Sequence, residues 1–311
     1  MLRLSVPWGA PVEILGDGDL DDVELTLVRL REAGAGYAVI TEPHDGLRPQ
    51  GFRLVAHEPG VCSIFALSSL VEPNDGIALD GLPYPPPEMM RLVAGIATPH
   101  RFYQRFMQGG AQVANRIVDL LARNDLTPEG ANAVLDFGCG CGRVIRWWKD
   151  LAGVQLHGTD YNPYLVEWCR ENLPFADFSV NGLEPALDLP DDRFGLVYSY
   201  SVFTHLPEQM QRPWLDELVR VTAPGGHLLL TFHGENTLGD LGEGDRTRFR
   251  AGELVVVARD ERDYGTNACA AYHPPGWVRD ILAGGLDVLD HWPADRSFKQ
   301  DAFLMRKRAA K

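Results

Sequence analysis

The chain has 311 residues, 45% of them hydrophobic, and a formal net charge of -14 at pH 7. This length allows a large hydrophobic core and favours two domains, or one domain with a large extension. The sequence has no run of about 18 apolar residues that could cross a bilayer, and Pro7, Gly9 and Pro11 interrupt the N-terminus before a signal-peptide core develops. The acidic balance offers no basic surface for nucleic acid or an anionic membrane. We therefore predict a cytoplasmic globular protein with neither kind of partner.

The five cysteines, at positions 62, 139, 141, 169 and 269, are an odd number and lack the spacing of a zinc site or a disulfide scaffold. They are expected to be reduced thiols, with no bound metal. Cys139 and Cys141, which alternate with glycines, are interpreted mainly as small residues that fill a tight loop.

The segment "LPYPPPEMM" (82–90) is stiff and polyproline-like, and it predicts a domain boundary that separates residues 1–85 from residues 86–311. Before it, β-like runs at 37–41, 52–57 and 62–67 and a helical pattern over 21–34 indicate a small α+β or mostly β unit. That unit carries no motif of recognisable function.

After the prolines, residues 100–126 have the spacing of one or two helices, with an apolar stripe through Val113, Ile117, Leu120 and Leu121. Strands and helices then alternate, which is typical of a mostly parallel sheet covered by helices on both faces. Strands are expected at 134–137, 155–159, 176–180, 196–200, 227–232, 286–291 and 302–306, and helices from about 142, 163, 208 and 274. Residues 252–273 are predicted to form a hairpin inserted over a ligand site at the carboxyl ends of the strands.

The first strand runs into "DFGCGCGRV" (136–144), where Gly138, Gly140 and Gly142 fall at every second position. This spacing differs from the G-x-G-x-x-G pattern of dinucleotide-binding folds. Asp136 would repel a pyrophosphate, but it suits a ligand with a positive charge, such as the sulfonium or ammonium of S-adenosylmethionine.

The next strand ends in "GTDYNP", so Asp160 is placed to accept hydrogen bonds from the hydroxyls of a ribose. Tyr161 could pack on an adenine face. The residues predicted to contact the adenine edge follow the third strand and are Asn181, Gly182 and Leu183.

Five segments resemble the motifs of a known family and occur in the same order as in that family: "VLDFGCGCGRV", "LHGTDYNP", "NGLEP", "DDRFGLVYSYSVFTHLPE" and "VRVTAPGGHLLLTFHG". Over roughly residues 100–306 the chain resembles class I S-adenosylmethionine-dependent methyltransferases, and bacterial enzymes of poorly specified substrate among them. The resemblance implies a Rossmann-like seven-stranded α/β sheet whose last strand is antiparallel. It also implies that the methionine end of the cofactor lies over the glycine loop, with the ribose on Asp160. The full set of predicted cofactor contacts is Asp136, Gly138, Cys139, Gly140, Gly142, Asp160, Tyr161, Asn181, Gly182, Leu183, Ser199 and Tyr200.

Methyl transfer depends mainly on alignment of the reacting groups and exclusion of water, so a general base is optional. Where one is used, His205 and His233 are candidates, since each follows a strand end and histidine titrates near neutral pH. His205 could alternatively cap a helix. His273 is a third candidate, and Tyr200 is expected to shape the methyl-transfer pocket.

The sequence favours methyl transfer to oxygen or nitrogen of a small molecule, such as a metabolite, sugar or natural product. Two alternatives stay open at this point: a regulatory protein that binds the cofactor without turnover, and an enzyme that transfers an aminopropyl group to an amine. A homodimer is one assembly the sequence allows. The substrate and the role of residues 1–85 do not follow from it.

Overall fold

The computed structural model describes residues 12–15, 37–40, 52–58, 62–67, 80–94, 102–295 and 298–309. The chain divides into two compact units, residues 1–84 and 85–311. In the first unit, β1 and β2 pair in parallel, and β4 pairs antiparallel with both β2 and β3. These strands are Val12–Leu15, Tyr37–Ile40, Phe52–Glu58 and Cys62–Leu67. The helix predicted over 21–34 lies outside the described residues.

The second unit is built on a seven-stranded sheet with the order β12-β13-β9-β8-β5-β6-β7. β13 is antiparallel to both of its neighbours, whereas β5 to β9 pair in parallel. The Rossmann-like sheet expected from the resemblance, with its last strand antiparallel, is therefore confirmed. Its strands are Ala133–Phe137 (β5), Gln155–Asp160 (β6), Asp177–Val180 (β7), Phe194–Ser199 (β8), Thr222–Phe232 (β9), Asp287–Trp292 (β12) and Asp301–Arg306 (β13).

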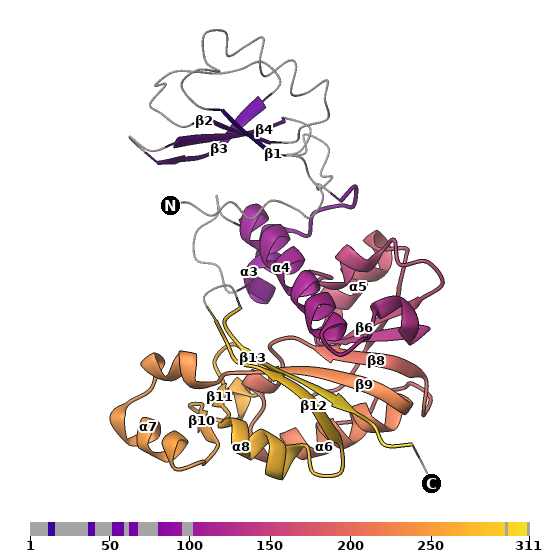
Figure 1. The fold of residues 1–311 in the computed structure, drawn as a ribbon, viewed down its shortest axis with the longest axis vertical. Coiled ribbons are helices and arrows are strands. Elements are labelled where there is room, and N and C mark those ends of the chain that lie inside the picture. The colour runs from indigo at the N-terminus through magenta and orange to yellow at the C-terminus, as the bar shows by residue number, and fades with distance from the viewer. Residues whose placement is uncertain are drawn as a thin grey trace. The chain divides into compact units, whose positions relative to one another are not determined.

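Helices cover both faces of this sheet, with α4 and α5 on one face and α6 and α8 on the other (Figure 1). The predicted apolar stripe of α4 is confirmed, because Val113, Ile117, Leu120 and Leu121 are all buried. On the other face, α6 buries Trp214, whose ring lies 4.7 Å from that of Phe137. The α-helices are Pro87–Ala94 (α3), Phe102–Ala122 (α4), Pro163–Asn172 (α5), Glu208–Val221 (α6), Glu243–Arg250 (α7) and Pro275–Trp277 (α8).

Three features differ from the prediction. The helix expected from Gly142 is a single 3-10 turn, Ile145–Trp148, preceded by glycines at 138, 140 and 142 that all have positive φ angles, which a helix cannot accommodate. The helix expected from Pro274 is one α-turn followed by a π-helical turn, Val278–Leu282. Helix α3 occupies the stretch that the prolines mark as stiff, since Pro87 stands in its first turn, where no hydrogen-bond donor is needed.

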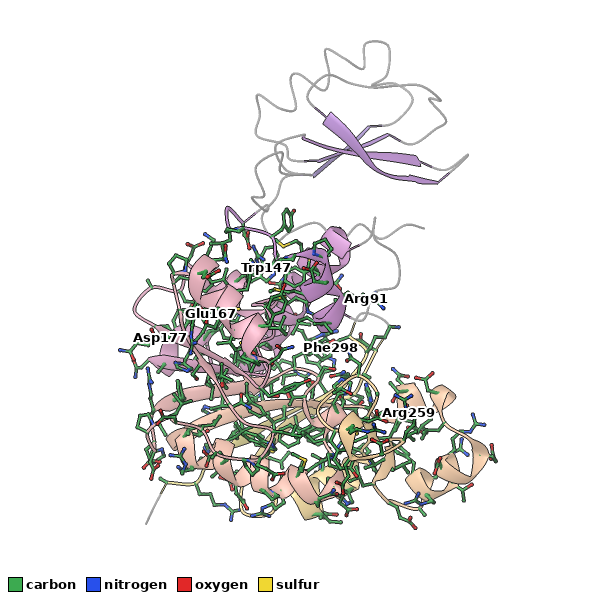
Figure 2. All side chains as sticks on the ribbon, turned by 180° about the vertical axis from the view of Figure 1, so that it is seen from behind. Arg91, Trp147, Glu167, Asp177, Arg259 and Phe298 are labelled. Atoms are coloured by element: carbon green, nitrogen blue, oxygen red, sulfur yellow. The ribbon has the colours of Figure 1, made fainter. Side chains whose placement is uncertain are left out.

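Residues 235–273 form a lobe beside the sheet (Figure 1). It contains α7 and an antiparallel pair, Val255–Val257 (β10) and Ala270–Tyr272 (β11). Its own small core consists of Leu238, Leu241, Phe249, Val255 and Tyr272. Arg259 lies in this lobe, away from the central sheet (Figure 2). None of the described helices is both long enough and apolar enough to span a membrane.

Candidate active site

A cavity of about 650 Å³ opens at the carboxyl ends of β5, β6 and β8. Parallel strands bring consecutive strand ends to one edge of a sheet, so motifs far apart in the sequence meet there. On one side of β5 the cavity is lined by Asp160, Tyr161, Asn181, Gly182 and Leu183, here called the β6 side. On the other side it is lined by Tyr200, Ser201, Val202 and His205, with Gly265, Thr266, Asn267 and Ala268 from the lobe, here called the β8 side.

The glycine loop between β5 and the 3-10 turn lies between these two sides. Gly138 and Gly140 line the cavity with φ angles of 81° and 55°, in the left-handed region that side chains disfavour. A Cβ atom on Gly138 would collide with Val202, and one on Gly140 would come within 2.7 Å of Val93 on α3. Because these two glycines have no side chains, Val202 of the segment after β8 and Val93 of α3 can pack directly on the loop backbone.

Asp136 is the next-to-last residue of β5, just before this loop, and its Oδ2 atom is buried without a hydrogen-bond partner. Burial is the main cause that raises the pKa of this carboxyl; the Tyr198 hydroxyl lowers it, nearby Asp160 raises it and Arg143 lowers it, and the net pKa is about 7. A buried carboxylate without a partner is costly. The site is therefore suited to a ligand that brings a positive charge to Asp136.

Asp160, at the end of β6, is held by the backbone of two loops. Its Oδ2 accepts from the Gly140 amide at 2.9 Å, and its Oδ1 accepts from the Asn162 amide at 2.9 Å. Burial raises the pKa of Asp160, and these two hydrogen bonds oppose the shift. A carboxylate can accept about four hydrogen bonds, so both oxygens keep capacity for further donors such as ribose hydroxyls.

The rest of the β6 side is positioned by local hydrogen bonds. Thr159 donates to Oδ1 of Asn181 at 2.8 Å, and the Asn181 amide donates to the Gly182 carbonyl at 2.7 Å. The indole of Trp214 donates to the Leu183 carbonyl at 2.9 Å. Tyr161 and Leu183 are exposed at the cavity mouth, where each offers an apolar surface to a flat ring.

On the β8 side, Ser201 adopts a left-handed φ of 64° that a buried network maintains. Its amide donates to Thr231, Thr231 donates to Oε1 of Gln300, and Gln300 donates back to the Ser201 hydroxyl, at 2.9, 2.6 and 2.8 Å respectively. Gln300 directly precedes β13. The last strand therefore fixes the loop that follows β8, and with it the place of Tyr200.

The hydrogen bonds of His205 define its tautomer. Its Nδ1 lies 2.7 Å from the Cys269 carbonyl, which can only accept, so Nδ1 carries the proton and Nε2 keeps a lone pair. The His205 carbonyl also accepts from the Gly265 amide at 2.8 Å, which ties the lobe to this residue. Burial lowers the pKa of His205, so the ring is neutral at pH 7. A neutral imidazole that lines a cavity can take up a proton.

Most of the predicted cofactor residues line the cavity, but three predicted site residues do not. Gly142 packs against Leu173, which directly follows α5, and a side chain at position 142 would collide with it. The positive φ of Gly142 therefore belongs to the packing of the loop and not to the cavity. Ser199 is completely buried within β8. His233 packs against Tyr272, with ring centres 5.4 Å apart, and its ring centre lies 6.4 Å from that of His205.

His273 is also outside the cavity. Its Nε2 contacts Oε1 of Gln211 at 2.8 Å within the core, and burial lowers its pKa to about 3. Burial likewise lowers the pKa of His233 to about 4. Of the three histidines singled out in the sequence, only His205 reaches the cavity.

The cysteines of the glycine loop are buried in a tight turn. Cys139 lines the cavity, and Cys141 is fully buried. The pKa of Cys139 is raised by its neighbour Cys169 and by burial, and that of Cys141 is raised by burial, so neither is a ready nucleophile at neutral pH. The described residues contain no group of three or more histidine, cysteine or acidic side chains arranged to hold a metal ion.

Sequence reasoning missed part of the lining. Leu92, Val93 and Ala94 come from α3, and Thr266 to Ala268 come from the lobe. The Asn267 amide donates to the Leu92 carbonyl at 3.0 Å, which joins these two segments over the site. No motif marks α3, whereas the lobe segment lies within residues 252–273, where the sequence predicted a hairpin over the site. Arg143, which directly follows the glycine loop in the sequence, could have been found by its position.

Comparison with known proteins agrees with this geometry. Residues 135–230 match the family described as "Methyltransferase domain". Residues 135–230 thus carry a methyltransferase domain, in agreement with the resemblance to class I S-adenosylmethionine-dependent methyltransferases and with S-adenosylmethionine as the cofactor of that domain.

The similar curated proteins include a probable chloroplastic tocopherol O-methyltransferase of Oryza sativa, 28% identical over 47% of this chain and 38% of the rice protein. A 2-methyl-6-phytyl-1,4-hydroquinone methyltransferase of Synechocystis is 34% identical over 34% of this chain and 33% of its own length. A malonyl-[acyl-carrier protein] O-methyltransferase of Serratia marcescens is 30% identical over 45% of this chain and 52% of its own length. The chain therefore spans between a third and about half of the length of these relatives.

Among solved structures, the magnesium protoporphyrin IX methyltransferase of Synechocystis with bound SAH is 16% identical, with a TM-score of 0.47. The match covers 71% of this chain and 93% of that one.

Proposed function

We propose that the protein transfers the methyl group of S-adenosylmethionine to an oxygen or nitrogen atom of a small molecule. One observation carries this proposal: a single cavity brings together the glycine loop, the buried carboxyl of Asp136 with its unpartnered Oδ2, the carboxylate of Asp160 and the neutral ring of His205.

The β6 side and the glycine loop would hold the cofactor. In this assignment Asp160 accepts from the ribose hydroxyls, and Asn181, Gly182 and Leu183 face the adenine. The backbone at Gly138 and Gly140 admits the methionine chain, and Asp136 faces its cationic end. The orphaned Oδ2 of Asp136 supports this fit, because a cationic ligand would supply the missing partner.

The β8 side would hold the acceptor. When bound, S-adenosylmethionine supplies a methyl group activated for attack by a nucleophile. His205 would take the proton of the acceptor at Nε2, from a hydroxyl as it attacks or from an ammonium before the resulting amine attacks, while its Nδ1 keeps its own proton and donates it to the Cys269 carbonyl. Tyr200, Val202 and the lobe residues Thr266 to Ala268 would exclude water and orient the acceptor.

The relatives support a small acceptor. Two of them are named as O-methyltransferases, of tocopherol and of malonyl-[acyl-carrier protein], and a third is named for a phytylated hydroquinone. These names favour oxygen over nitrogen as the methylated atom. The cytoplasmic location and a homodimer stay predictions.

The test is to incubate the protein with methyl-labelled S-adenosylmethionine and a small-molecule extract of its native cell, and to follow the label by mass spectrometry. Binding of SAH is measured in parallel by calorimetry. A labelled small product is expected. Cofactor binding without any labelled product would contradict the proposal and favour the regulatory alternative, whereas tighter binding of decarboxylated S-adenosylmethionine than of S-adenosylmethionine would favour aminopropyl transfer.

A further inference from the structure

The cavity contains a fixed cation that lacks a counter-ion. Arg143 lines the cavity and is partly buried, with its guanidinium 5.3 Å from the centre of the Tyr200 ring. Within the part of the chain that the structure describes, no carboxylate forms an ion pair with Arg143, although the other arginines of this unit that lie on its surface commonly form one. A partly buried guanidinium that lines a cavity and has no ion pair among the described residues can donate to an anion that enters the cavity.

Helix α4 helps to define the position of this arginine. A Cβ atom on Gly110 would collide with the Arg143 carbonyl, so the helix backbone packs directly on the residue. A Cβ atom on Gly109 would lie 3.8 Å from one terminal nitrogen of the guanidinium. The side chain therefore runs between the glycine face of α4 and the ring of Tyr200.

Asp136 does not neutralise Arg143. The two groups form no ion pair in the described structure, and the arginine is among the smaller influences on the pKa of this carboxyl. The other acidic group of the cavity, Asp160, is engaged with the Gly140 and Asn162 amides.

The sheet order places Arg143 away from the proposed ribose position. β5 lies between β6, which ends in Asp160, and β8, which leads into Tyr200. The guanidinium stacks on Tyr200, so it belongs to the β8 side, together with His205. An anion bound there would lie beside the proposed acceptor.

We propose that Arg143, stacked on Tyr200, binds a carboxylate of the methyl acceptor, so that the substrate is a small carboxylate-bearing molecule. This inference rests on the proposed function. The planar fork of a guanidinium matches both oxygens of a carboxylate, and its stacking on an aromatic ring leaves the edge that carries the N–H groups free to donate. The arginine would orient the acceptor so that its nucleophilic atom faces the methyl group and His205.

The test uses the full chain saturated with SAH, and benzoate as the probe. Benzoate is titrated by calorimetry into the wild type, into Arg143→Gln and into a matched control, Arg212→Gln, whose arginine is exposed on α6 and pairs with Asp216. Loss of a charge-assisted hydrogen bond predicts benzoate binding weakened about 10- to 100-fold in Arg143→Gln and unchanged in Arg212→Gln. Benzamide, the neutral analogue, should bind both variants and the wild type equally weakly. Equal benzoate binding by Arg143→Gln and the wild type, or none by the wild type, overturns the proposal.

A second comparison separates the acceptor from the cofactor, which has a carboxylate of its own. SAH and 5′-methylthioadenosine, which lacks the amino acid portion, are bound to the wild type and to Arg143→Gln. The proposal expects both ligands to keep their wild-type affinities. Weaker binding of SAH alone would assign Arg143 to the cofactor carboxylate and overturn the acceptor assignment, while failure of the wild type to bind SAH would contradict the proposed function itself.

Discussion

On the β6 side of the cavity, the residues that face the proposed cofactor come from two consecutive strand ends. Hydrogen bonds from the glycine loop, from the neighbouring strand end and from Trp214 of α6 hold them. On the β8 side, the lining combines the loop after β8 with α3 and residues 265–268 of the lobe, and Gln300 from just before β13 supports it. The first side is nearly complete within residues 136–183, whereas the second draws on segments from residue 92 to residue 300.

This difference suggests how the two sides divide the work. A side built from two neighbouring strand ends suits a ligand that is the same whatever the acceptor, such as the cofactor. The β8 side is assembled from separate segments, so the sequence of the lobe or of α3 can vary with the acceptor while the cofactor contacts stay the same. If this division holds, substitutions on the β8 side should reduce the rate of methyl transfer and leave SAH affinity unchanged. Substitutions on the β6 side should weaken SAH binding.

The largest expected effect is on the rate of His205→Asn. The Asn amide can still donate to the Cys269 carbonyl, so the loop is preserved, but the base at Nε2 is lost. We expect label transfer to the acceptor fraction to fall roughly 100- to 10,000-fold, as is typical for loss of a general base, with SAH affinity unchanged by calorimetry. The wild-type rate should also fall as pH drops through the lowered pKa of His205, and the variant should lack this limb. A variant that keeps the wild-type rate would leave His205 with a structural role only.

Asp160→Ala tests the opposite side. A ribose left without its acceptor costs about 1 to 3 kcal/mol, or roughly 5- to 150-fold in SAH affinity. Asp177→Ala, an exposed carboxylate on β7, serves as the control and should bind SAH as the wild type does. Because Asp160 also accepts from two backbone amides, the Tm of each variant is measured. Unchanged SAH affinity in a folded Asp160→Ala protein would show that the ribose lies elsewhere.

The same division explains which parts of the structure could be predicted. Hydrophobic periodicity and strand-helix alternation located all seven strands of the large sheet, because their cores are apolar and their ends carry polar motifs. The prediction of a helix from Gly142 was wrong, because Gly138, Gly140 and Gly142 have left-handed φ angles and a right-handed helix cannot begin there. Helix α7 was not predicted at all: its segment is mostly polar and buries only Phe249.

For the site, the motif-bearing residues on the β6 side and the glycine loop reach the cavity, with Gly142 as the exception. On the β8 side, sequence position could not separate His205 from His233, although both follow strand ends. The pairing of His233 with Tyr272 of β11 depends on the long-range placement of the lobe. Contacts across such sequence distances leave no periodic signal in the chain.

A third experiment examines the glycine loop where the two sides meet. If Asp136 must ionise to face the cationic end of the cofactor, affinity for S-adenosylmethionine should rise about tenfold from pH 6 to pH 8, because the pKa of the free carboxyl is about 7. Binding below pH 7 should also release protons, which calorimetry detects as a dependence of the observed heat on the buffer. Asp136→Asn should abolish both effects. A wild-type affinity that does not vary across this range would place the cofactor charge away from Asp136.

The smallest expected effect concerns stability next to the β8 side. His273 is neutral in the folded protein because burial lowers its pKa from 6.5 to about 3, while the unfolded chain takes up a proton near pH 6.5. Its contribution to the free energy of unfolding is therefore fully present above pH 6.5 and is lost as pH falls toward 3, by about 1 kcal/mol at pH 5.5. His273→Gln keeps a donor for Gln211 and removes the titration, so denaturant unfolding at pH 7.5 and 5.5 should show a smaller acid loss in the variant. Since His273 does not reach the cavity, SAH affinity should stay the same. An equal acid loss in both proteins would mean that His273 accepts a proton without unfolding, and that the core between α6 and the lobe is more open to water than its burial indicates.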